Sequence, residues 1–113
     1  MALAEPQNTA TSVNCAVSEY EWWQEAFETT SARLTEELAA DDVRDEFLGA
    51  DRAPLLQVEA DAFVAWREAT CDVVEAEARG GTLGGVLKAN CLLEMTAEYV
   101  LDLSARLIAL RRQ

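Results

Sequence analysis

The chain has 113 residues, of which 50% are hydrophobic and 27% are charged, and it contains only 5 glycines and 2 prolines. This composition excludes chains that stay disordered or form fibres, and the length suits a single folded domain. With 21 acidic residues against 9 basic ones and no histidine, the formal net charge is −12, which excludes nucleic acid and anionic lipid as partners by repulsion. The acidity either serves solubility or attracts a basic protein.

The first residues carry no helical periodicity. Residues 1–11 are small and polar and include Pro6, so we predict a flexible lead-in followed by a single helical domain over residues 12–113. Ala2-Leu3-Ala4 before Glu5 is either the end of a secretory signal, with Met1 in place of a removed leader, or a chance match. No apolar run reaches the roughly 20 residues that span a bilayer, so no transmembrane segment is predicted.

A first helix is predicted over residues 13–39. Ser12 or Asn14 can cap its start, and an apolar stripe follows at helical steps: Tyr20, Trp23, Phe27, Leu34 and Leu38. Residues 41–49 begin with cap-like acids and end in Gly49, which favours a short connector helix anchored by Phe47 and Leu48.

A second helix is predicted over residues 52–78, because Pro54 suits the first turn of a helix. Its buried stripe is predicted to consist of Leu55, Val58, Ala62, Trp66, Ala69 and Val73. Gly80 and Gly81 then end the helix, and Thr82 is expected to cap the next one.

The third helix, which reaches about residue 111, carries a coiled-coil-like seam. Val86, Leu93, Val100 and Leu107 are spaced by sevens, and a second set lies three positions further on: Ala89, Thr96, Leu103 and Leu110. None of the three helices can bury its stripe alone. We therefore predict an all-α antiparallel bundle of three long helices plus the short connector helix.

Two cysteines are placed symmetrically about the predicted turn. Cys71 and Cys91 each lie ten residues from Gly81, so an antiparallel hairpin brings them to the same height, where facing side chains can meet the Cα spacing of about 5.5 Å that a disulfide needs. This favours a disulfide-stapled hairpin in an oxidising compartment; the alternative is two buried thiols in a reducing cytosol. Cys15 is predicted to be a buried thiol, with a bond to another chain as the alternative.

The residue types of most enzymatic mechanisms are missing. The chain has no histidine and no Cys-x-x-Cys motif, and the glycine-rich residues 80–85 lack the lysine and preceding strand of a nucleotide-binding loop. The acidic run at 41–46 does not follow an EF-hand pattern, and helix capping explains it better. We predict a non-enzymatic protein with no catalytic residues, no cofactor and no metal. Trp22 is the one tryptophan off the predicted stripes and a candidate ligand platform.

Four motifs are spread over roughly residues 14–105: Cys15-Ala16-x-x-Glu19-Tyr20, Phe63-x-x-Trp66-Arg67-Glu68-x-x-Cys71, Gly80-Gly81-Thr82, and Cys91-Leu92 with Thr96. In these motifs the sequence resembles the lysozyme inhibitor LprI family of secreted bacterial proteins. The chain departs from the family pattern at Phe63 (typically Trp), at Gln24 (typically Asp) and at Phe27-Glu28 (typically Leu-Asn). A further cysteine that family members often have upstream of Cys15 is missing, so no disulfide of Cys15 is carried over.

The resemblance implies an exported domain, periplasmic or secreted and in some cases lipid-anchored, with lysozyme inhibition in some members. Animal lysozymes are basic, so a charge of −12 would steer the two proteins together. Candidate partner-binding residues lie at the two bundle ends and in the shared motif: Asp41, Asp42, Asp45 and Glu46; Gly80, Gly81 and Thr82; Arg67 and Glu68. For Arg67 and Glu68 the preferred interpretation is a local ion pair or a bond to a neighbouring helix. The alternative function is a structural or adaptor module of the bacterial envelope.

Overall fold

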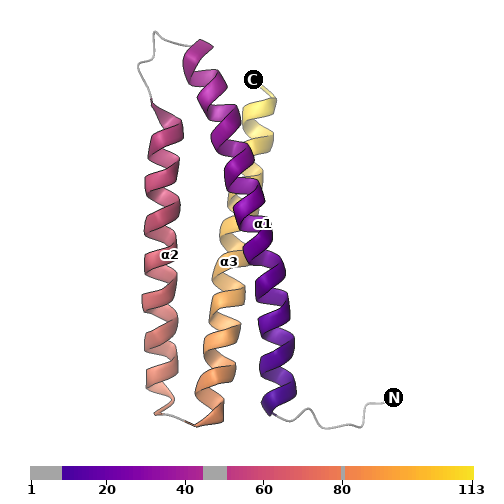
Figure 1. Ribbon diagram of the computed structural model, residues 1–113, viewed down its shortest axis with the longest axis vertical. Helices are drawn as coiled ribbons and strands as arrows, with labels where there is room; N and C mark the ends of the chain where they lie inside the picture. Colours follow the sequence, from indigo (N-terminus) through magenta and orange to yellow (C-terminus); the bar gives the residue numbers. More distant parts are fainter. Residues whose placement is uncertain (1–8, 45–50, 80) are drawn as a thin grey trace, which may run out of the picture.

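The computed structural model describes residues 9–44, 51–79 and 81–113, and these segments are almost wholly helical (Figure 1). Helix α1 spans Thr9–Arg44, α2 spans Arg52–Glu77 and α3 spans Thr82–Arg111. The helices alternate in direction along the chain, so α2 is antiparallel to both of the others (Figure 1). The predicted all-α antiparallel arrangement of three long helices is therefore confirmed.

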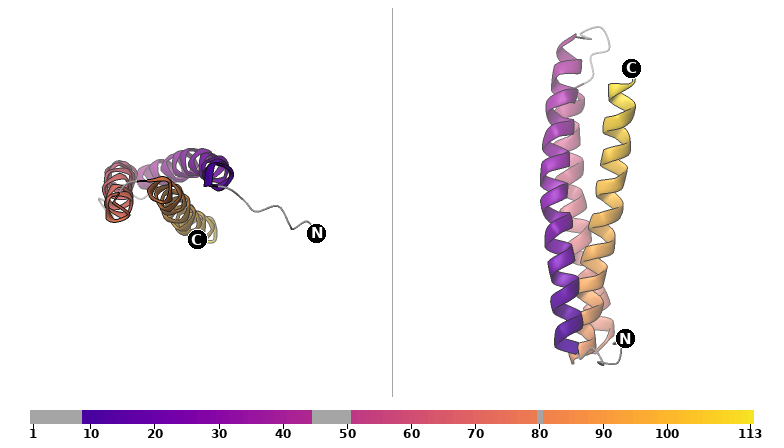
Figure 2. Two further views of the ribbon diagram at one scale, coloured as in Figure 1. Left: turned by 90° about the horizontal axis from the view of Figure 1, so that it is seen from below. Right: turned by 90° about the vertical axis from the view of Figure 1, so that its right-hand side faces the viewer.

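The molecule is long and flat. Its principal-axis extents are 60 × 33 × 15 Å and its radius of gyration is 18.1 Å, whereas a compact domain of this length has a radius of about 13 Å. α2 stands at one side of the molecule, and α1 and α3 cross beside it (Figures 1 and 2). Each helix therefore has a wide exposed face.

The core runs between the three helices as a narrow strip. Its buried members are Phe27 and Leu34 of α1, Leu56, Ala60 and Phe63 of α2, and Val100, Leu103 and Leu107 of α3. The seam predicted for α3 is confirmed, because five of its eight residues are buried and three are half-buried. The α1 stripe is confirmed at Phe27 and Leu34, while its other members are half-buried.

Helix α1 is longer than predicted at both ends. Residues 9–11, predicted to belong to the lead-in, are helical, whereas residues 1–8 lie outside the described part of the chain. The connector-helix prediction was wrong for residues 41–44, which form the last turn of α1. Residues 45–49, with Phe47 and Leu48, lie outside the described residues. Two features explain why α1 continues through residues 41–44. Two alanines, which are strong helix formers, precede Asp41. Arg52 pairs with Asp41 and Asp42 and so offsets the unfavourable interaction of these acids with the helix dipole at this end.

The predicted buried stripe of α2 was wrong. All six of its residues are exposed, and we call them the outer stripe: Leu55, Val58, Ala62, Trp66, Ala69 and Val73. The buried residues, here called the inner face, are Ala53, Leu56, Ala60, Phe63, Arg67 and Cys71. The disulfide supplies the physical reason. Cys71 must face α3, and residues at successive three- and four-residue steps before Cys71 then face the interior as well.

The predicted disulfide between Cys71 and Cys91 is present and joins α2 to α3, with Cα atoms 5.6 Å apart. The sulfur of Met95 packs over the bond, 3.8 Å from the Cys71 sulfur and 3.9 Å from the Cys91 sulfur. The prediction for Cys15 was wrong, because its thiol is exposed. Its neighbour Ala16 faces the core instead, and adjacent residues of a helix point about 100° apart.

No helix within the described ranges combines the length and the apolar character that a membrane crossing requires.

Candidate partner-binding site

The candidate residues taken from the sequence do not come together in one place. The acids at 41–42 lie at the end of the bundle where α1 meets α2, and Gly81 and Thr82 lie at the opposite end, where α2 meets α3 (Figure 1). The molecule is 60 Å long between its ends. A single contact site cannot include both groups.

Asp41 and Asp42, at the end where α1 meets α2, make contacts within the protein. Arg52 donates from its Nε to Asp42 Oδ1 at 2.8 Å and also pairs with Asp41. The Ala53 backbone N–H donates to Asp42 Oδ2 at 3.1 Å, so Asp42 caps α2 across the connector. Partial burial opposes the ionisation of Asp42, but the hydrogen bonds from Arg52 and Ala53 outweigh it and lower the pKa of Asp42. Asp45 and Glu46 lie outside the described residues.

The glycine-rich end is a tight turn. Gly81 has a φ of 81°, in the left-handed region that glycine adopts without strain, and it occupies the N-cap position of α3. The expectation that Thr82 caps this helix was therefore wrong, and Thr82 is the first helical residue. A Cβ at Gly84 would lie 3.2 Å from the Glu75 carbonyl oxygen, so the lack of a side chain there lets α3 approach α2. Gly80 lies outside the described residues.

Arg67 is an interior tie between all three helices. Only 3% of it is exposed, and its Nη1 donates to Gln24 Oε1 of α1 at 2.7 Å and to Thr96 Oγ1 of α3 at 3.0 Å. Its Nε pairs with Glu68 at 2.9 Å, and its guanidinium lies 5.4 Å from the centre of the Tyr20 ring. The preferred interpretation, a local ion pair or a bond to a neighbouring helix, is confirmed in both forms. Arg67 itself presents almost no surface to a partner.

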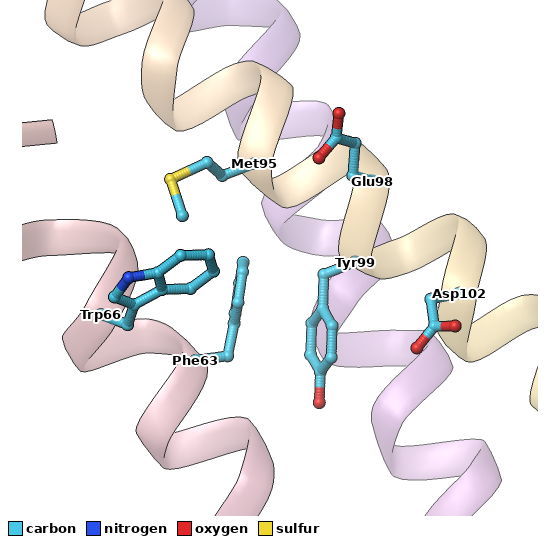
Figure 3. A pocket seen from close by; sticks show the side chains of 6 residues that line it. All are labelled: Phe63, Trp66, Met95, Glu98, Tyr99 and Asp102. Carbon is cyan, nitrogen blue, oxygen red and sulfur yellow. The ribbon is translucent and has the colours of Figure 1, made fainter. Parts of the chain in front are cut away.

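Three aromatic side chains line a groove between α2 and α3 that was not predicted from the sequence (Figure 3). The groove holds about 240 Å³ and is lined by Phe63, Trp66, Met95, Glu98, Tyr99 and Asp102. The Phe63 and Tyr99 rings stack, with centroids 4.2 Å apart, and Trp66 stands beside them with 63% of its surface exposed. The groove was not predicted because the sequence pattern assigned Trp66 to the buried stripe of α2. The sequence did contain one signal for the groove. Because Cys71 must face α3, the helical repeat of α2 places Trp66 on the outside.

The rim of the groove is acidic. The Tyr99 hydroxyl donates to Glu59 Oε1 at 2.6 Å, and both its burial and this carboxylate raise the pKa of Tyr99, so it remains a neutral phenol. Arg106 is shared between Glu59, at 2.9 Å, and Asp102, at 2.7 Å. Glu98 is exposed, and no basic group of the described segments forms an ion pair with it. The rim therefore carries surplus negative charge.

The groove continues into the outer stripe of α2, to which Trp66 belongs. The exposed fractions of the large side chains in the stripe are 65% for Leu55, 65% for Val58, 63% for Trp66 and 58% for Val73. These side chains form an apolar stripe on the surface that a partner could cover. The arrangement can bind a partner through apolar contact and negative charge. The described residues contain no group of three or more side chains able to hold a metal ion.

These features define a class of small, acidic, disulfide-linked helical bundles with an exposed apolar helix face. The chain belongs to the lysozyme inhibitor LprI family, whose model matches residues 2–103. The resemblance seen in the sequence motifs is thereby confirmed, and this is a family of inhibitors by description. Neither a curated protein nor a solved structure matches the chain.

Proposed function

We propose that the protein is a non-enzymatic, exported envelope protein that binds lysozyme through its acidic surface and inhibits it. The family match over residues 2–103 carries this proposal. The net charge of −12 supports it, since a basic lysozyme would be attracted and its association accelerated.

The pairing of the basic side chains supports the same conclusion. Six of the 9 basic residues form ion pairs with carboxylates of this chain: Arg44, Arg52, Arg67, Lys88, Arg106 and Arg111. Most of the positive charge is thus neutralised internally, and the acidic surplus remains at the surface. An approaching basic protein therefore meets a surface with a negative net charge.

The disulfide supports export. Disulfides form and persist in the periplasm and outside the cell, and they are rare in the bacterial cytosol. The bond between Cys71 and Cys91 joins α2 to α3, the two helices that form the walls of the groove. This chemistry supports a periplasmic or secreted location, which would bring the protein to the compartment where lysozyme acts.

A cell-wall lysis assay tests the proposal. Purified oxidised protein is added in increasing excess to several lysozymes at low and at high salt. We expect slower lysis by animal lysozymes, with weaker inhibition at high salt because exposed charges are screened. Unchanged lysis at stoichiometric excess, including low salt, would remove lysozyme inhibition as the function.

The alternative function, an envelope adaptor, is favoured by one observation, the exposed outer stripe of α2. An adaptor that assembles through this stripe would self-associate or bind an apolar surface independently of salt. Sedimentation of the oxidised protein at several concentrations tests for an adaptor that self-associates, since we expect the lysozyme-binding protein to be a monomer on its own.

A further inference from the structure

We propose that the groove between α2 and α3 is a subsite for one cationic side chain, arginine or lysine, of a basic protein partner. The identity of that partner as lysozyme rests on the proposed function. The chemistry of the subsite rests on the groove alone, which combines aromatic walls from two helices with an acidic rim (Figure 3).

The size of the groove suits a side chain better than a whole ligand. Its volume of about 240 Å³ is below the roughly 300–1,000 Å³ of sites that enclose drug-sized molecules. Its walls are the rings of Phe63, Trp66 and Tyr99 and the thioether of Met95. A long cationic side chain has an apolar stem that packs on such walls while its charged head stays near water.

The aromatic walls are suited to a cation. The face of a tryptophan ring attracts guanidinium and ammonium groups, and Trp66 is largely exposed. The Tyr99 hydroxyl is already bound to Glu59, so its phenol is fixed in place and its ring lies beside Phe63. Little ordering is then required when a side chain enters.

The charges of the rim select for positive charge. Of the three carboxylates at the rim, Glu59 and Asp102 pair with Arg106, whereas Glu98 is in none of these pairs. Glu98 is left to neutralise an incoming head group. A second copy of this chain would instead bring another acidic rim against this one, and like charges placed opposite each other are unfavourable.

The outer stripe of α2 supplies the apolar surroundings. An aromatic anchor near the centre of a contact, flanked by apolar side chains that exclude water, is the usual form of a binding hot spot. Leu55, Val58 and Val73 extend from Trp66 toward both ends of α2. Apart from Arg52 and Arg67, which bind carboxylates of the protein, the charged residues of α2 are acidic: Glu59, Asp61, Glu68, Asp72, Glu75 and Glu77.

The first test uses a probe that is independent of lysozyme. The peptide acetyl-Gly-Arg-Gly-amide is titrated into oxidised full-length protein with labelled methionine methyl groups and tryptophan indoles, followed by NMR. A control peptide carries citrulline, which has the shape of arginine without its charge. We expect the Met95 methyl and the Trp66 indole to shift with the arginine peptide and much less with the citrulline peptide. Absent shifts, or equal responses to both peptides, would overturn the subsite.

The second test measures lysozyme affinity in matched variants. Trp66→Ala is expected to weaken binding by roughly tenfold or more, as for an aromatic hot spot, and Glu98→Gln by about threefold, as for an exposed ion pair. The controls are Trp22→Ala on α1, whose tryptophan has the same exposed fraction of 63%, and Glu94→Gln, one turn away on α3. Equal losses in variants and controls would contradict the subsite.

The outcomes separate the two proposals. If the arginine peptide binds but lysozyme does not, lysozyme inhibition fails and the subsite stands. If lysozyme binds and neither Trp66→Ala nor Glu98→Gln weakens it, the subsite fails and the inhibitor function stands. Shifts at Trp66 that depend on protein concentration, with no response to the peptide, would assign the groove to self-association and overturn the proposal.

Discussion

The two faces of α2 reverse the usual relation between polarity and burial. The inner face buries a charged residue, Arg67, among mostly small side chains, whereas the outer stripe exposes Leu55, Val58, Trp66 and Val73. Hydrophobicity alone would have turned the helix the other way. The disulfide and the hydrogen bonds of Arg67 hold the inner face inward, so the apolar outer stripe remains available for contact with a partner.

Two substitutions three residues apart give the largest contrast between the faces. Phe63→Ala on the inner face is expected to lower the free energy of unfolding by about 3–5 kcal/mol, the usual loss for a buried phenylalanine. Trp66→Ala on the outer stripe is expected to cost about 1 kcal/mol or less, because most of that side chain is in water. Urea unfolding of both variants checks this, and equal losses would contradict the assigned phase of α2.

Breaking the disulfide tests what holds the inner face inward. The bond closes a loop with a sequence separation of 20, so Cys71→Ser with Cys91→Ser is expected to destabilise the protein by about 3 kcal/mol. Urea unfolding with and without reductant measures the same difference. Cys15→Ser is the control and should change little, since that thiol is exposed. A midpoint that reductant leaves unchanged would argue against the bond in solution.

Arg67 is expected to contribute somewhat less to the free energy of unfolding than the disulfide does. Arg67→Met keeps most of the volume but leaves the fully buried Thr96 hydroxyl without its donor, so we expect a loss of about 2 kcal/mol. Glu68→Gln, which alters only the half-exposed partner of Arg67, should cost about 0.5 kcal/mol or less. If thermal unfolding ranks the two variants the other way, Arg67 is not the interior tie.

The smallest predicted effect is at the connector end and depends on pH. Because Arg52 and the Ala53 N–H lower the pKa of Asp42 in the folded protein, its contribution to stability is present above the unfolded value of about 3.9. That contribution is lost as the pH falls through the lower folded value. Asp42→Asn should therefore be less stable than the wild type at pH 7, with the difference narrowing below about pH 4. Urea midpoints at pH 7 and pH 3 measure it, and a difference independent of pH would contradict this role.

The parts of the fold that the sequence predicted are those fixed by short-range or symmetric patterns. The seam of α3 repeats every seven residues, and Cys71 and Cys91 lie at equal distances from Gly81, so both predictions were correct. The end of α1 was missed because Asp41 and Asp42 resemble the start of a helix. These two acids are tolerated at the C-terminal end of α1 because they pair with Arg52, which follows the connector in the sequence.

The site was less predictable because α2 carries two apolar stripes. The larger side chains favoured the outer stripe as the core, which hid Trp66 and with it the groove. Applying the disulfide to the helix phase would have corrected this, because four-residue steps back from Cys71 reach Arg67 and Phe63. The contribution of Glu98 and Tyr99 from α3 depends on how the helices pack, and no local pattern predicts it.

On the proposed function, a partner binds the outer stripe and the groove rather than the ends of the bundle. Backbone amide shifts of the oxidised, ¹⁵N-labelled protein on addition of lysozyme test this claim most directly. We predict the largest changes along α2 from Leu55 to Val73 and around Glu98 and Tyr99 of α3. Changes confined to residues 41–44 and 51–52, or to residues 81–85, would contradict it.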